Sequence, residues 1–103
     1  MHSFDLTGKV AVITGGGQGI GEGIARAYAE SGAAVVVAAR HVDRVQRVAD
    51  EINSSGGRAL AVPTDVTDRG ALVALADAAI EAFGGVDIWV NNAGGSTVRS
   101  PLV

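Results

Sequence analysis

Residues 14–21 have the sequence TGGGQGIG and lie between two apolar patterns of different period. Residues 9–13, KVAVI, form a short run rich in β-branched side chains, which is typical of a buried strand. After the glycines, apolar residues recur at helical spacing as far as Ser31, and Gly32 follows as a candidate left-handed C-terminal cap. The sequence therefore predicts a buried strand, a glycine-rich turn and an amphipathic helix.

Strand and helix patterns alternate along the rest of the chain. Short apolar runs predict three more strands, at residues 34–39, 59–62 and 86–90. Amphipathic stripes predict two more helices, at residues 42–52 and 72–83. Thr67 is the predicted N-cap of the last helix, with Asp68 in its first turn, and Gly84 and Gly85 end it.

The order βαβαβαβ, with short connections, predicts an α/β fold with a doubly wound parallel sheet of Rossmann type. The expected strand order is 3-2-1-4, in one dinucleotide-binding domain that occupies residues 1–103. Glycine clusters follow the first and fourth strands, where the winding of such a sheet reverses direction. A ligand crevice is expected at that point.

The glycines at 15, 19 and 21 have a G-x3-G-x-G spacing. Gly15 and Gly19 allow the backbone to bend and approach a pyrophosphate, and Gly21 allows the helix to pack tightly on the first strand. Free N–H groups at a helix N-terminus bind phosphate. We therefore expect a dinucleotide cofactor. A methyltransferase that holds S-adenosylmethionine in a glycine-rich loop is an alternative, but that ligand lacks the pyrophosphate.

The end of the second predicted strand indicates which cofactor is favoured. An acidic side chain about 20 residues beyond the glycine turn would bind the ribose 2′-hydroxyl of NAD. Ala39 and Arg40 stand there instead. A guanidinium forms charge-assisted hydrogen bonds with a 2′-phosphate. We predict NADP(H) in preference to NAD(H), with Arg40 as the main contact and Arg44 as a second one.

Three motifs in order resemble those of the short-chain dehydrogenase/reductase family, in its ordinary rather than its extended branch. They are TGGGQGIG at 14–21, Asp65-Val66 and NNAG at 91–94, and the resemblance extends from Leu6 to Gly94. It implies that the pyrophosphate and its ribose are lined by Gly15, Gln18, Gly19 and Ile20. It also implies that Asp65 and Val66 bracket the adenine ring. Asn91, Ala93 and Gly94 would border the nicotinamide ribose.

The same resemblance implies hydride transfer between NADP(H) and a small-molecule carbonyl/alcohol substrate, by a full-length protein that forms a homo-oligomer. Family members use a Tyr, a Lys four residues later, a Ser and an Asn, all beyond the fourth strand. Tyr28 has Gly32 four residues on and lies in the apolar stripe of the first helix, so it is predicted to be a core residue. No catalytic residue is assigned.

The chain is therefore expected to be the N-terminal cofactor-binding part of an oxidoreductase, truncated after the fourth strand and inactive alone. Its fourth strand would be an unpaired edge. The alternative is a non-catalytic dinucleotide-binding module or an inactive fragment.

Composition excludes several other classes of protein. The net charge is −3 and the eight basic residues are scattered, so nucleic acid is not an expected partner. The longest apolar run, residues 33–39, is too short to cross a bilayer, and we expect a soluble cytoplasmic protein. The chain has no cysteine, and neither His2 nor His41 has metal-ligand spacing, so no metal site is expected.

Overall fold

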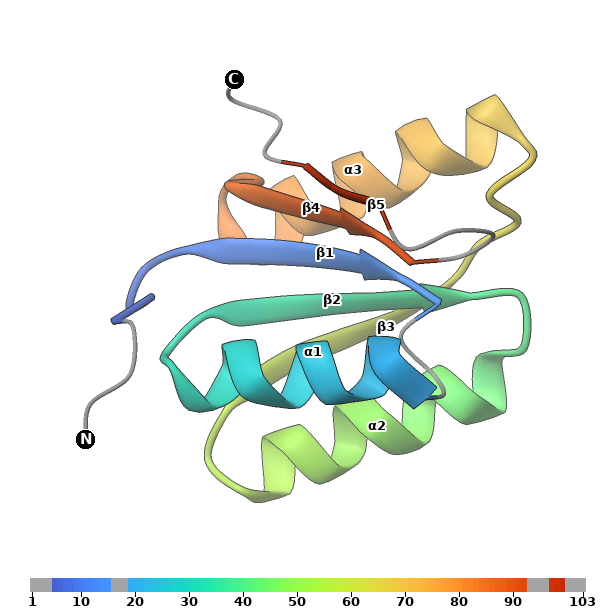
Figure 1. Ribbon diagram of the computed structural model, residues 1–103. Helices are drawn as coiled ribbons and strands as arrows, with labels where there is room; N and C mark the ends of the chain where they lie inside the picture. The colour runs from blue at the N-terminus through green and yellow to red at the C-terminus, as the bar shows by residue number, and fades with distance from the viewer. Residues whose placement is uncertain (1–4, 16–18, 93–96, 100–103) are drawn as a thin grey trace.

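The computed structural model describes residues 5–15, 19–92 and 97–99, which form one sheet flanked by helices (Figure 1). In chain order the elements are β1 (Val10–Thr14), α1 (Gly19–Glu30), β2 (Ala34–Ala39), α2 (Val42–Ser54), β3 (Arg58–Pro63), α3 (Arg69–Phe83), β4 (Ile88–Asn91) and β5 (Thr97–Arg99).

The sheet has the order β3-β2-β1-β4-β5. β1 is central and parallel to both neighbours, so that Thr14 is in register with Ala38 of β2 and with Asn91 of β4. The predicted parallel order 3-2-1-4 is confirmed. The prediction of an unpaired fourth strand is wrong, because β5 pairs antiparallel with β4. β5 is too short for periodicity to reveal it, although two of its three residues are β-branched.

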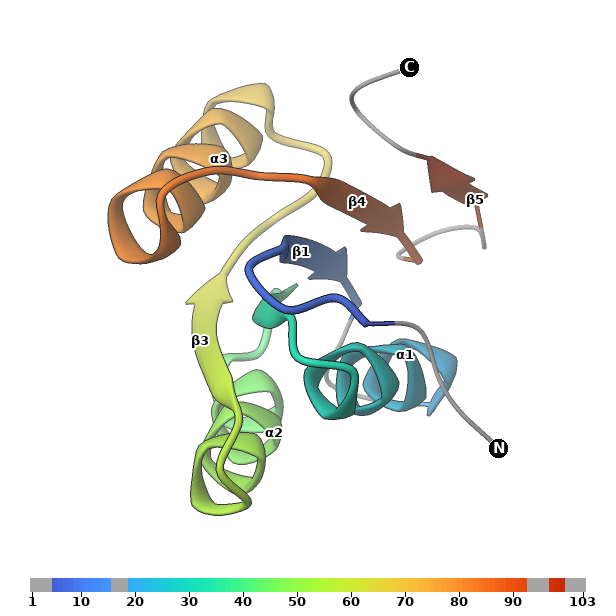
Figure 2. The same cartoon turned by 90° about the vertical axis from the view of Figure 1, so that its left-hand side faces the viewer.

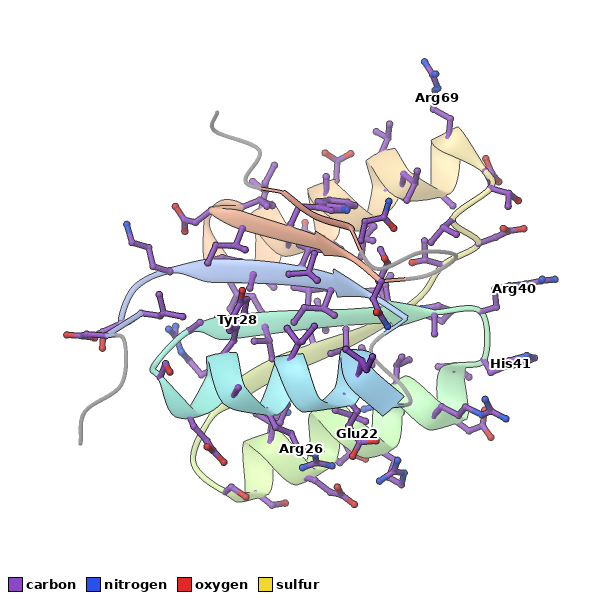
Figure 3. The ribbon with its side chains drawn as sticks, viewed as in Figure 1. Glu22, Arg26, Tyr28, Arg40, His41 and Arg69 are labelled. Carbon is purple, nitrogen blue, oxygen red and sulfur yellow. The ribbon has the colours of Figure 1, made fainter. Side chains whose placement is uncertain are left out.

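Helices cover both faces of the sheet: α1 and α2 lie on one side and α3 on the other (Figure 2). Because side chains alternate along a strand, each face has its own apolar cluster. The first cluster contains the buried residues Ala11, Ile13, Ala25, Ala33, Val35, Val37, Val45, Val48, Ala49, Ile52 and Val90. The second contains Val10, Val12, Ala34, Val36, Ala38, Leu75 and Ala79. Tyr28 is half-buried and packs against the first cluster, in agreement with its predicted core role (Figure 3).

The N-terminus of α3 differs by one residue from the prediction. The cap is Asp68, whose Oδ1 accepts hydrogen bonds from the N–H groups of Gly70 at 2.9 Å and Ala71 at 3.4 Å. Thr67 does not cap the helix, because its hydroxyl donates to Asp65 Oδ1 at 2.6 Å. At the other end, Gly84 has φ +94° and its N–H donates to the Ile80 carbonyl, as expected of a glycine cap.

The first turn of α1 packs directly on the backbone that follows β1. A Cβ atom placed on Gly21 would lie 2.2 Å from the carbonyl oxygen of Gly15 and 2.8 Å from Nδ2 of Asn92. No side chain fits between the helix and the turn, so the close packing predicted for Gly21 is present.

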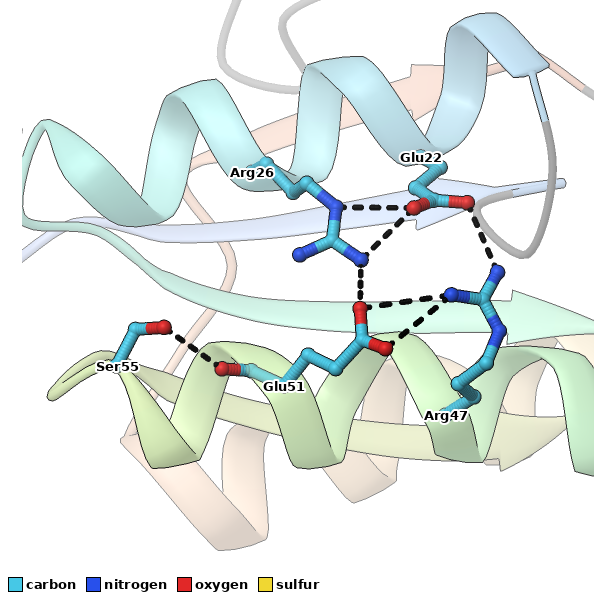
Figure 4. Close-up of polar contacts among 5 residues, drawn as sticks. All are labelled: Glu22, Arg26, Arg47, Glu51 and Ser55. Atoms are coloured by element: carbon cyan, nitrogen blue, oxygen red, sulfur yellow. Dashed lines mark hydrogen bonds and ion pairs between the residues drawn. The ribbon is translucent and has the colours of Figure 1, made fainter.

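Four charged side chains join α1 to α2 (Figure 4). Arg26 binds Glu22 one turn before it at 2.8 Å and also binds Glu51 of α2. Arg47 of α2 binds Glu22 at 3.1 Å and Glu51 at 3.4 Å. Each arginine therefore contacts both glutamates, and the charges of the two helices are balanced across their interface.

We expect Gly21→Ala to destabilise the fold by about 1–3 kcal/mol, because overpacking outweighs the better helix propensity of alanine. Gly23→Ala is the matched control, since a Cβ at Gly23 meets nothing within 4 Å. It should stabilise the chain by about 0.5–1 kcal/mol. Urea unfolding of both variants measures the difference, and equal stability of the two would contradict the close packing.

The ion-pair network also predicts a dependence of stability on pH. Hydrogen bonds from Arg26, and then Arg47, lower the pKa of Glu22, and those from Arg26 lower the pKa of Glu51. A carboxyl whose pKa is lower in the folded state stabilises the fold above its unfolded-state pKa, about 4.3 for Glu. That contribution disappears as the pH falls through the lower, folded-state pKa.

Glu22→Gln should therefore cost about 0.2–1 kcal/mol at pH 7 and nothing at a pH below the folded-state pKa, where Glu22 is itself protonated. Glu81→Gln makes the same change of charge on the exposed face of α3. This variant should have the same stability as the unchanged chain throughout the pH series. Thermal unfolding at a series of pH values measures both. A Glu22→Gln difference that persisted at low pH would show that packing, not charge, is responsible.

Candidate cofactor site

The glycine turn bends at the two positions predicted from its spacing. Gly15 follows β1 with φ +71°, and its N–H donates to the Ala38 carbonyl at 2.6 Å. Gly19 begins α1 with φ +57°. Both values lie in the left-handed region that glycine adopts without steric cost. Gln18, the remaining polar member of the predicted turn, lies outside the described residues.

Among the described residues, none covers one side of the start of α1. A Cβ atom on Gly19 would meet nothing within 4 Å, and the neighbouring side chain, Ile20, is 68% exposed. The first N–H groups of a helix have no partner within the helix and carry its positive dipole end. α1 therefore presents hydrogen-bond donors beside the carboxyl end of β1, where no described residue lies within 4 Å of the Cβ position of Gly19.

A buried hydroxyl joins the ends of β1 and β4. Thr14 Oγ1 lies 3.0 Å from Asn91 Oδ1, to which it donates, and it accepts from the N–H of Asn92 at 3.1 Å. The Thr14 side chain is fully buried, whereas Asn91, the last residue of β4, is exposed. The hydroxyl thus fixes the first residues of the NNAG motif against the glycine turn. Ala93 and Gly94 lie outside the described residues.

Sequence reasoning assigned no role to Thr14 or Asn92. The available signal was a polar residue at the end of an otherwise apolar buried strand. A buried hydroxyl needs hydrogen-bond partners, and such a position places it at the sheet edge where those partners would be found.

Asp65 occupies the connection between β3 and α3 and is held by a local turn. Its Oδ1 accepts from both the N–H and the hydroxyl of Thr67, at 3.0 Å and 2.6 Å. These two bonds, the hydroxyl's first, lower the pKa of Asp65, and the positive charge of Arg40 lowers it further. Asp65 is therefore ionised at neutral pH. Val66 beside it is half-buried.

Arg40 follows β2 directly and projects beyond the carboxyl end of that strand (Figure 3). The Arg40 side chain is exposed. Among the described residues it interacts electrostatically with Asp65 but forms no hydrogen bond or ion pair. Arg44 is exposed in the first turn of α2. Figure 3 also shows His41 and Arg69 on this side of the molecule, so several basic side chains lie on the side where the parallel strands end.

No group of three or more histidine, aspartate or glutamate side chains in the described part of the chain is placed to hold a metal ion. None of the helices described there is long and apolar enough to cross a membrane.

Known proteins are similar to this chain in both sequence and fold. The family model described as short chain dehydrogenase matches residues 9–102. The chain is 52% identical over 90 residues to 7alpha-hydroxysteroid dehydrogenase of Escherichia coli, an alignment that covers 87% of this chain and 35% of that protein. It is 46% identical over 102 residues to an uncharacterized oxidoreductase of Mycobacterium tuberculosis, covering 99% of this chain and 39% of the relative.

A solved structure of 7 alpha-hydroxysteroid dehydrogenase, complexed with NADH and 7-oxo glycochenodeoxycholic acid, superposes with a TM-score of 0.85 at 52% identity. That comparison covers 87% of this chain and 35% of the solved one. The chain thus spans little more than a third of the length of these relatives. The family-model match over nearly all its residues, together with these similarities, shows that the chain belongs to the short-chain dehydrogenase family.

Proposed function

We propose that this chain supplies the cofactor-binding half of an oxidoreductase that transfers hydride between NADP(H) and a small-molecule carbonyl/alcohol substrate. Membership of the short-chain dehydrogenase family supports the reaction class. One observation carries the proposal: Thr14, Gly15 and Asn91 meet beside the start of α1. This contact brings N–H groups that can donate hydrogen bonds to a phosphate, and the end of β4, to one edge of the sheet.

In this proposal, residues along this edge would contact the whole length of a dinucleotide. The turn from Gly15 to Ile20 would bind the pyrophosphate, with Gln18 contributing a side-chain amide. Asp65 would accept a hydrogen bond from the adenine amino group through Oδ2, because Oδ1 is used by Thr67. Val66 would pack on the adenine ring. Asn91, Ala93 and Gly94 would border the nicotinamide ribose, and the bound nicotinamide would donate or accept the hydride.

The preference for NADP(H) rests on Arg40. The related 7 alpha-hydroxysteroid dehydrogenase was solved with NADH, so kinship alone does not favour the phosphorylated cofactor. In this chain, however, the position after β2 carries a guanidinium that no carboxylate of the described residues engages in an ion pair. A ribose 2′-phosphate would supply such a partner.

A cofactor-binding protein without turnover is the second candidate for the chain as it stands. Its 103 residues contain one tyrosine, Tyr28, which packs on the core side of α1 and has Gly32 rather than a lysine four residues later. We propose that these residues bind the cofactor but do not catalyse hydride transfer alone. The full-length protein would be a soluble, cytoplasmic homo-oligomer.

Isothermal calorimetry with NADPH and NADH tests the cofactor proposal. We expect NADPH to bind about ten- to a hundredfold more tightly than NADH, from charge-assisted bonds worth about 1.5–3 kcal/mol. Arg40→Ala should remove most of this preference and leave the NADH affinity unchanged. Lys9→Ala is the matched control, because it removes an exposed positive charge at the opposite edge of the sheet.

Three outcomes would contradict parts of the proposal. Equal or tighter binding of NADH by the unchanged chain would refute the preference for NADP(H). Binding of S-adenosylmethionine in place of both dinucleotides would favour a methyltransferase. Oxidation of NADPH by the 103-residue chain with a panel of aldehydes and ketones would refute the proposed lack of turnover.

A second prediction concerns the hydroxyl of Thr14. Thr14→Val keeps the shape of the side chain but leaves the N–H of Asn92 without its acceptor. We expect a loss of about 1–3 kcal/mol in the free energy of unfolding, and weaker NADPH binding because Asn91 is no longer held. Thr14→Ser, which keeps the hydroxyl, should retain the NADPH affinity. Equal NADPH affinities for the Val and Ser variants would show that this hydroxyl does not position the site.

A further inference from the structure

The side chain of Asn53 forms two hydrogen bonds with one residue of the edge strand β3. Ala59 donates its N–H to Asn53 Oδ1 at 2.8 Å, and Asn53 Nδ2 donates to the Ala59 carbonyl at 3.1 Å. Asn53 lies in the last turn of α2, shortly before the chain enters β3. Its amide group therefore occupies both backbone hydrogen-bonding groups of Ala59, as an adjacent strand would.

These bonds lie on the free side of β3, away from β2. Along a strand, successive residues direct their N–H and C=O groups alternately to one side and the other. Thr64 directs its N–H to Ala39, which ends β2, at 2.8 Å. The backbone N–H and C=O groups of the even-numbered residues of β3 therefore point toward β2. Ala59, Ala61 and Pro63 face the free side.

Only one of these three outward-facing residues retains an available N–H. That of Ala59 is bound to Asn53, and Pro63 has none. Within the described part of the chain, the N–H of Ala61 is the one donor that remains on the free side of β3. Edge strands with several free donors and acceptors pair readily with strands of other molecules, and such pairing needs consecutive hydrogen bonds in register.

We propose that Asn53 is an edge guard: its amide closes the free edge of the sheet to strand addition by β3 of a second copy of this chain. Two β3 strands related by a twofold axis perpendicular to them would run antiparallel and join two sheets edge to edge. Asn53 and Pro63 block the two ends of that contact. The edge guard thereby directs self-association, wherever it occurs, to surfaces other than this edge.

The test compares Asn53→Ala with Gln46→Ala. Gln46 is the matched control, because it is also an exposed amide on α2, but its partner is Asp50 of the same helix. Light scattering during size-exclusion chromatography should show that Asn53→Ala at least doubles its apparent mass as concentration rises. Gln46→Ala should elute with the unchanged chain.

Hydrogen exchange of single amides identifies the surface involved. In the unchanged chain, the Ala59 amide should exchange about fivefold more slowly than that of Ala61, for one hydrogen bond worth about 1 kcal/mol. In associated Asn53→Ala, the Ala61 amide should become the slower one. Ala61→Pro added to Asn53→Ala removes the last outward N–H and should restore the original mass.

Asn53→Leu decides the question if Asn53→Ala fails to fold, since it also removes both hydrogen bonds to Ala59 while keeping a side chain of similar size. It should associate more strongly than Gln46→Ala. The proposal is overturned if the folded Asn53 variants keep the mass of the unchanged chain. It is equally overturned if they associate while the Ala61 amide stays fast, or if that amide is already slow in the unchanged chain.

Discussion

The contact between Gly21 and the Gly15 carbonyl determines how the rest of this structure is arranged. With no side chain between them, α1 begins directly against the end of β1, and its free N–H groups lie at the carboxyl edge of the sheet. Thr14, one residue earlier, joins the same point to β4. A methyl group on Gly21 would push the start of α1 away from Gly15 and Asn92, which follow β1 and β4.

The fold could be predicted from the sequence because hydrophobic periodicity is a local signal. Buried parallel strands have continuous apolar runs, and each helix has its own stripe, so the order of elements and the parallel part of the sheet follow. The one-residue error at Asp68 arose where two good capping residues are adjacent. β5 was missed because three residues have no measurable period.

The candidate site was only partly predictable because its contacts join residues far apart in the chain. The bends at Gly15 and Gly19 follow from the spacing of the glycines. The Thr14–Asn91 bond joins residues 77 positions apart, and no local pattern indicates it. The network between α1 and α2 is similar: each Glu–Arg pair has helical spacing, but the contact between Arg26 and Glu51 depends on how the two helices pack. Arg26 and Arg47 therefore form ion pairs with glutamates, whereas Arg40 at the sheet edge forms none with the described residues.

The central position of β1 has a consequence for how the chain acquires its structure during synthesis. β1 leaves the ribosome before both of its neighbours in the sheet, and one of them, β4, follows only after α1, β2, α2, β3 and α3. At about 5–20 residues per second, the 77 residues that separate Thr14 from Asn91 take roughly 4–15 s to synthesise. During that interval β1 can pair only with β2, and its other edge stays open to unintended partners. The nascent chain is therefore most exposed to aggregation before β4 is made, and this is the period in which a chaperone would protect it.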